Sequence, residues 1–403
     1  MKVFNFINHA SIKTEYGGLS CITDPWYVSN AFGSWVQAPS PNENDIFDLI
    51  DADEKVGVVI SHGHDDHIDD WFISKHLNDK IFFCSKFATP GLEKRLTKKL
   101  GVTTRPIGSG EVFGDFKFNQ FVNPDFSEYD AVITIETPDF LIIHANDNWH
   151  KWPENMTNEI KKISDKYNEG NIFLLIQFGI ADCFPVNYEG VTEQEALDII
   201  NGRFERYLKA TESNMKSLNL KHMYYYANQT YFKYKECKLN GLSMYQISQK
   251  FLLERGVKHI QLEPGMSVHK GHKITKGSSN TNNIFRYSLI ALENFINEEY
   301  KKICNPNEYI AVRFKTLDDE VSKADINYIA SHEVWKRILN GNLTLEAIII
   351  GGSGSIITPD ININRRNHHM FVSKRSYIAQ NMINLKGLSF FREFASIKNL
   401  NKK

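Results

Sequence analysis

The chain has 403 residues, enough for one large folded domain and a second, smaller one. Its 42% hydrophobic and 24% charged residues are typical of a globular protein. Because the formal net charge is only -1, electrostatics give no reason to expect nucleic acid or an anionic membrane surface as a partner.

The cysteines indicate a protein of a reducing environment. All five are spread along the chain without a C-x-x-C pair, which argues against a disulfide framework and against a thiolate zinc site. We therefore expect a cytoplasmic protein. No stretch approaches 18 apolar residues, so we expect no membrane span, and the N-terminal stretch alternates like a strand rather than a signal peptide.

The first part of the chain combines three short N-terminal strands with strand–helix units. Its predicted elements are strands at 2–8, 11–16, 19–24 and 55–61, a helix at 68–77, a strand at 80–85 and a helix at 89–101. The run at 55–61 is continuous and β-branched, as expected for a strand buried on both faces. Asp65 or Asp66 is expected to cap the helix that follows it.

A second strand-rich block follows and then gives way to alternating helices and strands. Its predicted elements are strands at 111–123, 130–137 and 139–147, a helix at 154–168, a strand at 171–179, a helix at 192–215, a strand at 220–228, a helix at 243–256 and a strand at 258–265. Strands followed by strand–helix units, repeated in two halves, predict an α/β (α+β) protein built as a four-layer αββα sandwich.

The composition changes once, near residue 270. The stretch 268–283 is polar and rich in glycine, serine and asparagine, which is typical of a linker or a long loop. We therefore expect a first domain over 1–275 and a smaller C-terminal α+β region over 284–403.

One short segment concentrates metal-binding side chains. His62, His64, Asp66 and His67 form an H-x-H-x-D-H pattern directly after the strand predicted at 55–61. Residues two apart in an extended loop point to the same side, so His62 and His64 can bind one ion together. Asp66 and His67 diverge at the start of the next helix, which suits a second ion. Imidazole and carboxylate ligands favour zinc, iron or manganese.

This motif at the end of a buried strand resembles the metallo-β-lactamase superfamily, which carries it in an αββα fold. Residues 7–27 resemble the opening hairpin of that fold and end near a structural aspartate, here Asp24. In the segment L-I-I-H-A-N-D-N, Asp147 stands where the family places a carboxylate that bridges two metals. The resemblance covers about residues 1 to 270.

Within the superfamily, three segments resemble one branch: N-H-A-S with D-P-W-Y, H-A-N-D-N-W and A-N-Q-T-Y-F. That branch includes ascorbate-6-phosphate lactonase, the phospholipase D acting on N-acyl phosphatidylethanolamine, and the lactamase-like part of CMP-N-acetylneuraminate hydroxylase. The chain contains neither C-x-H nor C-x-x-H, so it lacks the Rieske iron–sulfur domain that accompanies the hydroxylase.

The distal ligands that the resemblance implies are missing. No histidine occurs between His76 and His144, where the family has one, and Asn228 occupies the place of the last histidine. Three alternatives stay open. In the first, Asp125 replaces the imidazole and gives an oxygen-rich metal position that favours iron or manganese. In the second, the second metal position is weak or empty. In the third, a histidine from elsewhere completes it, the candidates being His150, His269 and His272.

The residues support a metal-dependent hydrolase that uses metal-activated water on an ester, lactone, amide or phosphodiester of a small or sugar-like substrate. Its cofactors would be one or two divalent ions, either zinc or else iron or manganese. Asp66 and Asp147 would be its catalytic residues. One alternative is an iron-dependent, diiron oxygenase resembling the sialic acid hydroxylase, which would need electrons from a redox partner. The other is a degenerate, non-catalytic binding protein. Neither the substrate nor the oligomeric state follows from the sequence.

Overall fold

The computed structural model describes most of the first three hundred residues and parts of the remainder. The described residues are 1–27, 29, 31–32, 35–37, 39, 41–50, 55–123, 130–180, 191–228, 230–232, 244–257, 259–276, 293, 297, 312–315, 326–331, 334–335 and 354–357. The chain divides into two compact units, Met1–Ser279 and Asn280–Lys403.

An eight-stranded mixed sheet forms one half of the first unit. Its order is β17-β16-β1-β2-β3-β5-β6-β7. The strands are β1 (Lys2–Asn8), β2 (Ser11–Tyr16), β3 (Leu19–Thr23), β5 (Val56–Ile60), β6 (Ile81–Ser85), β7 (Thr103–Ile107), β16 (Met266–His269) and β17 (Lys273–Lys276). The strands from β3 to β7 are parallel and the others antiparallel, so the sheet combines N-terminal hairpins with strand–helix units.

A seven-stranded mixed sheet forms the other half, in the order β15-β13-β12-β11-β10-β9-β8. Its strands are β8 (Ser109–Phe113), β9 (Phe116–Val122), β10 (Ala131–Glu136), β11 (Leu141–His144), β12 (Ile172–Gln177), β13 (Met223–Tyr226) and β15 (Ile260–Gln261). The run β11-β12-β13-β15 is parallel, whereas β8, β9 and β10 form an antiparallel meander that joins β11. A separate two-stranded pair joins β4 (Trp35–Gln37) to β14 (Thr230–Phe232).

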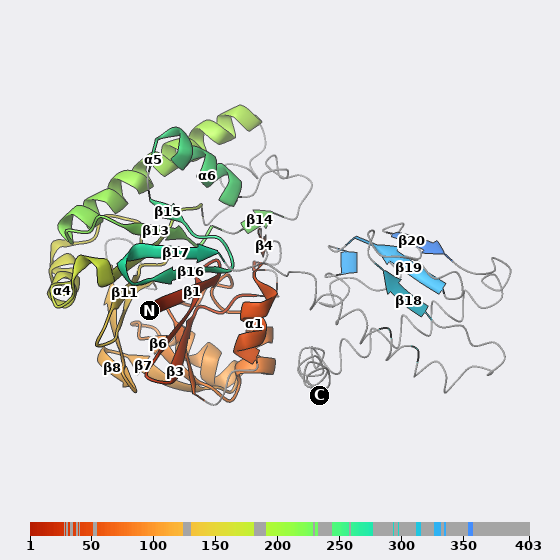
Figure 1. Cartoon of the computed structure of the whole chain (residues 1–403), viewed down its shortest axis with the longest axis horizontal. Helices are drawn as coiled ribbons and strands as arrows, with labels where there is room; N and C mark the ends of the chain where they lie inside the picture. The colour runs from red at the N-terminus through yellow and green to blue at the C-terminus, as the bar shows by residue number, and fades with distance from the viewer. Residues whose placement is uncertain are drawn as a thin grey trace. The chain divides into compact units, whose positions relative to one another are not determined.

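Helices cover the outer face of each sheet, as Figure 1 shows for α5 and α6 on one side and α1 on the other. The helices are α1 (Glu43–Ile50), α2 (Asp70–Phe72), α3 (Gly91–Lys94), α4 (Glu154–Ser164), α5 (Glu193–Ser217) and α6 (Met244–Glu254). Turns of π-helix extend α2 over Ile73–Leu77 and α3 over Arg95–Lys99. In the described part of the chain, no helix combines the length and apolar content needed to cross a bilayer.

Alternation along the buried strands separates three apolar layers. On β5, Val58 and Ile60 pack with Leu49 of α1 and Phe72 of α2, while Val59 faces the interior between the sheets. On β12, Leu174 packs among the residues of α4, α5 and α6, and Leu175 faces the other sheet. An apolar layer between the sheets and one beneath each set of helices make a four-layer αββα sandwich, so the fold prediction is confirmed.

The helix after the H-x-H-x-D-H motif begins later than expected, and the prediction that Asp65 or Asp66 caps it is wrong. Asp69 is the cap, with its Oδ1 accepting a hydrogen bond from the Phe72 backbone N–H at 3.0 Å. The Asp65 carboxylate instead accepts a hydrogen bond from Arg95, and the Asp66 carboxylate accepts one from His9. The loop 61–69 therefore stays non-helical because its polar side chains have partners elsewhere in the fold.

The second unit contains a small sheet formed by β18 (Val312–Lys315), β19 (Ile326–Ala330) and β20 (Gly354–Ile357). β18 and β19 are parallel, and β20 runs antiparallel to β19. Phe314 packs against Trp335 with ring centroids 4.8 Å apart and against Tyr328 at 5.9 Å, which gives this unit an aromatic core of its own.

Truncating a side chain in the layer beneath α5 should destabilise the sandwich. Leu174 is fully buried, so Leu174→Ala should lower the free energy of unfolding by about 2–5 kcal/mol, through lost burial and the cavity left behind. Leu253 is 81% exposed, and Leu253→Ala should change it by less than about 0.5 kcal/mol. Denaturant unfolding measures both values, and equal effects would contradict the layer assignment.

Candidate metal centre

The ligand-type residues of the motif gather at one edge of both sheets. His62, His64, Asp66 and His67 lie in the loop that follows β5, and Asp147 lies in the loop that follows β11. Loops at the carboxyl ends of parallel strands are where α/β folds usually place their sites. We call these five residues the candidate metal centre.

His62 and His64 form its first pair. The Nε2 of His62 lies 2.9 Å from the Nδ1 of His64, and the two rings are 4.5 Å apart between centroids. Because Zn–N bonds are about 2.0–2.1 Å long, this separation allows both nitrogens to bind one ion. His62 is fully buried, whereas His64 is exposed, so the pair connects the interior of the centre with solvent.

Asp147 lies between this pair and His67. One of its carboxylate oxygens is 3.7 Å from the Nε2 of His62, and the other is 3.5 Å from the Nε2 of His67. The ligand atoms of these three residues all lie within 4.8 Å of one another, and the same holds for His9, Asp66 and His67. His67 is common to both groups, so the two groups are adjacent.

The carboxylate of Asp24 fixes the orientation of His67 and of the loop. It accepts hydrogen bonds from the Ser61 backbone N–H at 2.8 Å, the Ser61 hydroxyl at 2.7 Å and the His67 Nδ1–H at 3.0 Å. With Nδ1 donating to Asp24, the Nε2 of His67 faces Asp147. A carboxylate behind a histidine in this way sets both its tautomer and its direction as a ligand.

His9 orients Asp66 in a similar way. It lies between β1 and β2, and its Nε2–H donates to Asp66 Oδ2 at 3.1 Å. Both side chains are buried, and the His9 ring packs edge-on against Trp26. Among the described residues, Asp66 Oδ1 has no hydrogen-bond partner. One oxygen of Asp66 is therefore held and the other remains available.

The protonation preferences follow from burial and from the mixture of charges. Burial, together with the neighbouring His67 and His64, lowers the pKa of His62 well below its usual value, so it is a neutral imidazole. Burial disfavours a charge on His67, but Asp66, Asp147 and Asp24 outweigh it and raise its pKa. The carboxylates that favour a proton at this position would equally favour a metal cation.

Asp130 is the acidic residue that the structure places beside the centre in the segment where a histidine was expected. It directly precedes β10, is buried, and has its Oδ1 3.6 Å from the Nδ1 of His62. Burial and the charge of Asp147 raise the pKa of Asp130 well above its usual value. Asp125, which the offset from the strand favoured, lies outside the described residues.

The other candidate ligands have different surroundings. The side-chain amide of Asn228 donates to the Phe178 carbonyl at 3.0 Å and to the Ser248 hydroxyl at 2.7 Å. His150 packs on Trp149, burial lowers its pKa to about 4, and it belongs to neither group of three described above. His269 bonds Thr275, and His272 lies with Glu169 and His222. The structure thus brings none of the three histidines into the two groups of ligand atoms, and the Asn228 amide nitrogen bonds to Phe178 and Ser248 instead.

The donor set fits a divalent ion. Within the described part of the chain, Asp66 Oδ1, His67 Nε2 and Asp147 Oδ1 are buried and lack a well-formed hydrogen bond. Buried polar atoms without partners are costly, and a bound cation would compensate all three at once. The donors are nitrogen and oxygen without sulfur, which suits zinc, iron and manganese.

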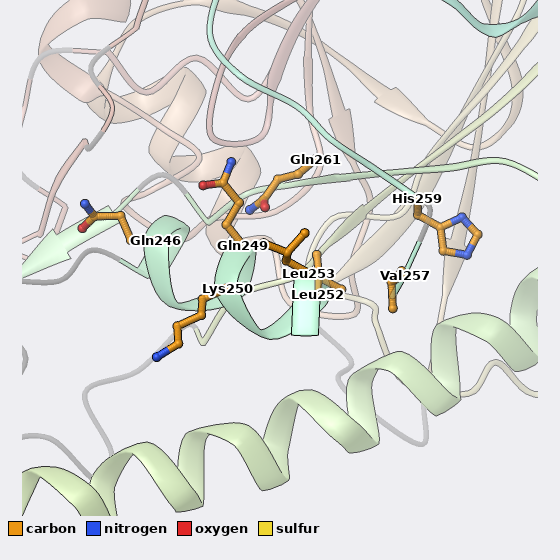
Figure 2. Close-up of a pocket in the computed structure, with 8 residues that line it drawn as sticks. All are labelled: Gln246, Gln249, Lys250, Leu252, Leu253, Val257, His259 and Gln261. Carbon is orange, nitrogen blue, oxygen red and sulfur yellow. The ribbon is translucent and has the colours of Figure 1, made fainter. Parts of the chain in front are cut away.

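A pocket elsewhere in the first unit has no residue in common with the candidate metal centre. It has a volume of about 450 Å³ and is lined by residues of α6 and of the segment that follows, among them Gln249, Lys250, His259 and Gln261. Figure 2 shows Gln249 next to Gln261 in this pocket. Since it contains none of the ligand-type residues above, we do not assign the substrate to it.

Comparison with protein-family models and with curated proteins finds no match. Among solved structures, the chain is similar to the metallo-hydrolase Igni18 from Ignicoccus hospitalis, with 16% identity over 66% of this chain and 96% of that one, and a TM-score of 0.39. It is also similar to the metallo-β-lactamase fold protein YhfI from Bacillus subtilis, with 11% identity over 68% and 97% and a TM-score of 0.35.

A third similar structure has different chemistry. CmlA from Streptomyces venezuelae, a diiron β-hydroxylase, has 14% identity over 68% of this chain and 54% of that one, with a TM-score of 0.41. At such identities and TM-scores these similarities identify no activity for this chain. Its fold is assigned from its own layers, strand order and motif position, which agree with the metallo-β-lactamase-like sandwich that the sequence predicted.

Removing the negative charge of Asp24 should weaken metal binding without a change in any of the five proposed ligands. Asp24→Asn replaces an acceptor of three hydrogen bonds, so His67 should lose its fixed tautomer and metal affinity should fall about 10- to 100-fold. Competition with a chromophoric chelator measures the affinity. Asp48→Asn, an exposed position on α1, is the matched control, and equal affinities in the two variants would contradict this role.

Proposed function

We propose that this chain is a metal-dependent hydrolase whose candidate metal centre holds one or two divalent ions. The observation that carries the proposal is the convergence of His62, His67 and Asp147, with ligand atoms within 4.8 Å of one another in a buried site. The expected substrates are small or sugar-like esters, lactones, amides or phosphodiesters. These share an electrophilic carbonyl or phosphoryl centre that water can attack.

The position of the Asp147 carboxylate is compatible with two bound ions. Its two oxygens face different histidines, His62 on one side and His67 on the other. A carboxylate in this position can be shared between adjacent ions. His62 and His64 would hold the first ion, and His67 and Asp66 the second.

The chemistry expected of a bound divalent ion is to lower the pKa of water to near 7 and to polarise the substrate oxygen. The residues of the chain would orient the reactants. Asp66, held through one oxygen by His9, can accept a hydrogen bond from the attacking water with the other. His64 is exposed and lies where substrate would approach from solvent.

A second candidate function is an iron-dependent oxygenase supplied with electrons by a partner. The observation that favours it is that each of the two groups of ligand atoms contains a carboxylate, Asp66 in one and Asp147 in the other, which makes the donor set rich in oxygen. Such a set suits iron or manganese better than a histidine-rich set does. The identity of the bound metal separates the two candidates, and a chain that retains no metal would instead be a binding protein.

Loss of a proposed ligand should remove metal from an otherwise folded chain. His64→Ala and Asp147→Ala should each lower the metal content of purified protein by at least one equivalent, because each removes a direct donor. Elemental analysis measures the content, and far-ultraviolet CD should remain close to wild type. Asp139→Ala, on the partly exposed turn before β11 where the carboxylate pairs with Lys270, is the control. Full metal content in both ligand variants would sink the proposal.

His9→Asn should slow turnover while the metal is retained. The variant removes the group that holds Asp66, and asparagine tolerates the left-handed backbone at this position, where φ is 48°. We expect kcat to fall about 10- to 100-fold on the best substrate of an ester, lactone and phosphodiester panel, with a shifted pH–rate profile. Unchanged kcat and pH–rate profile would show that His9 does not position Asp66 for catalysis.

A further inference from the structure

We propose that Glu169, His222 and His272 form a second site for a divalent transition-metal ion, separate from the candidate metal centre and independent of the proposed function. Their ligand atoms all lie within 4.8 Å of one another. One carboxylate and two imidazoles form a donor set typical of zinc and of neighbouring ions with imidazole affinity. We call this group the 169–222–272 site.

The site lies at the opposite end of the strands from the candidate metal centre. Glu169 begins a 3₁₀ turn directly before β12, and His222 directly precedes β13. His272 ends the turn between β16 and β17, which belong to the other sheet. Because β12 and β13 are parallel to β11, their amino ends lie away from Asp147, which follows the carboxyl end of β11. The 169–222–272 site therefore joins the two sheets of the sandwich.

The distances suit a shared ion. The Nδ1 of His222 lies 3.0 Å from Glu169 Oε1, which lets both atoms reach one ion with bonds of about 2.0–2.2 Å. The His222 and His272 rings are stacked, with centroids 4.1 Å apart and planes 21° apart. Glu169 is itself held by the Lys221 backbone N–H at 3.3 Å. Metal binding would replace the proton that His222 now shares with the carboxylate.

Tyr224 supports His272 from the interior. In this structure the Nε2–H of His272 donates to the Glu169 carbonyl at 3.2 Å, and the Tyr224 hydroxyl donates to Nδ1 at 2.9 Å. Binding of an ion through Nε2 would displace the Nε2 proton and exchange the tautomer. When Nε2 binds an ion, Nδ1–H can donate to the Tyr224 oxygen. A hydrogen bond to the other ring nitrogen is the usual support for a metal-binding histidine.

The turn that contains His272 has left-handed backbone. His272 has a φ of 59°, and Gly271 before it has a φ of 71°. Histidine is among the non-glycine residues that adopt this region most readily, so the turn accommodates it. In this conformation the His272 ring stacks on that of His222.

The ion would connect segments that are far apart in the sequence. It would add a link between the turn before β12, the start of β13 and the β16–β17 hairpin, and so stabilise the folded state in proportion to free metal. His222 is exposed and the other two ligands are partly exposed, so the ion would exchange with solvent. We therefore expect a stabilising site that responds to zinc availability.

Zinc titration of the full chain tests the proposal. Competition with a chromophoric chelator should show one fewer zinc equivalent in each of Glu169→Gln, His222→Gln and His272→Asn than in wild type. Asparagine is chosen at His272 because it tolerates a positive φ. Added zinc should raise the Tm of wild type more than that of the three variants, because the variants keep only the candidate metal centre. His64→Ala should keep the part of the increase that the 169–222–272 site supplies.

The control is His269→Gln, which changes a histidine of the same hairpin whose partner is Thr275. If the three variants bind as many zinc ions as this control, with the same affinity, the 169–222–272 site does not exist. Glu169→Gln is close to isosteric and decides the outcome should His272→Asn fail to fold, as judged by CD. Failure of the proposed function would appear as unchanged zinc binding in His64→Ala, which leaves this test unaffected.

Discussion

The buried carboxylate of Asp24 is the interaction on which the arrangement of the candidate metal centre depends. Asp24 directly follows β3. Its carboxylate accepts hydrogen bonds from the backbone N–H and hydroxyl of Ser61, just after β5, and from His67 in the loop beyond. A buried charge is costly unless it is fully paired, so this carboxylate stabilises only one loop conformation. In that conformation His67 and Asp66 face Asp147 across the gap between the sheets. The orientation of His67 thus follows from one side chain that is not among the proposed ligands, while that of Asp66 follows from His9.

The two sheets contribute different chemistry to this edge. The eight-stranded sheet supplies the histidines and Asp66 through a single loop, while the seven-stranded sheet supplies Asp147. The seven-stranded sheet also places Asp130 at the Nδ1 of His62, on the side of the ring away from Asp147. The opposite edge reverses part of this division, because the seven-stranded sheet there provides Glu169 and His222, and the hairpin of the other sheet provides His272. The metal content of the purified chain would therefore be the sum of ions bound at the candidate metal centre and at the 169–222–272 site.

Local patterns were sufficient to predict most of the strands, the layers and the H-x-H-x-D-H loop, because alternation and motif spacing act over a few residues. They were wrong for the stretch expected to be a linker from residue 268, where β16 and β17 form a hairpin of the eight-stranded sheet. They failed where partners are distant. Asp65 and Asp66 look like helix caps in isolation, but Arg95 and His9 hold them and Asp69 caps the helix instead. Asp130 had no local feature to set it above Asp125, since its contact with His62 depends on how the two sheets face each other. Glu169, His222 and His272 are over a hundred residues apart from first to last, so no spacing rule could unite them.

The position of β1 has a consequence for how the chain acquires its structure. β1 lies between β2 and β16, and Asn5 is bonded to Ser267, 262 residues later. The eight-stranded sheet therefore cannot close until almost the whole first unit has left the ribosome. Until then one edge of β1 exposes unpaired backbone groups, a state that invites intermolecular pairing. Pairing between strands so distant in sequence slows folding. A nascent or truncated chain that ends before β16 is therefore expected to bind chaperones or to aggregate.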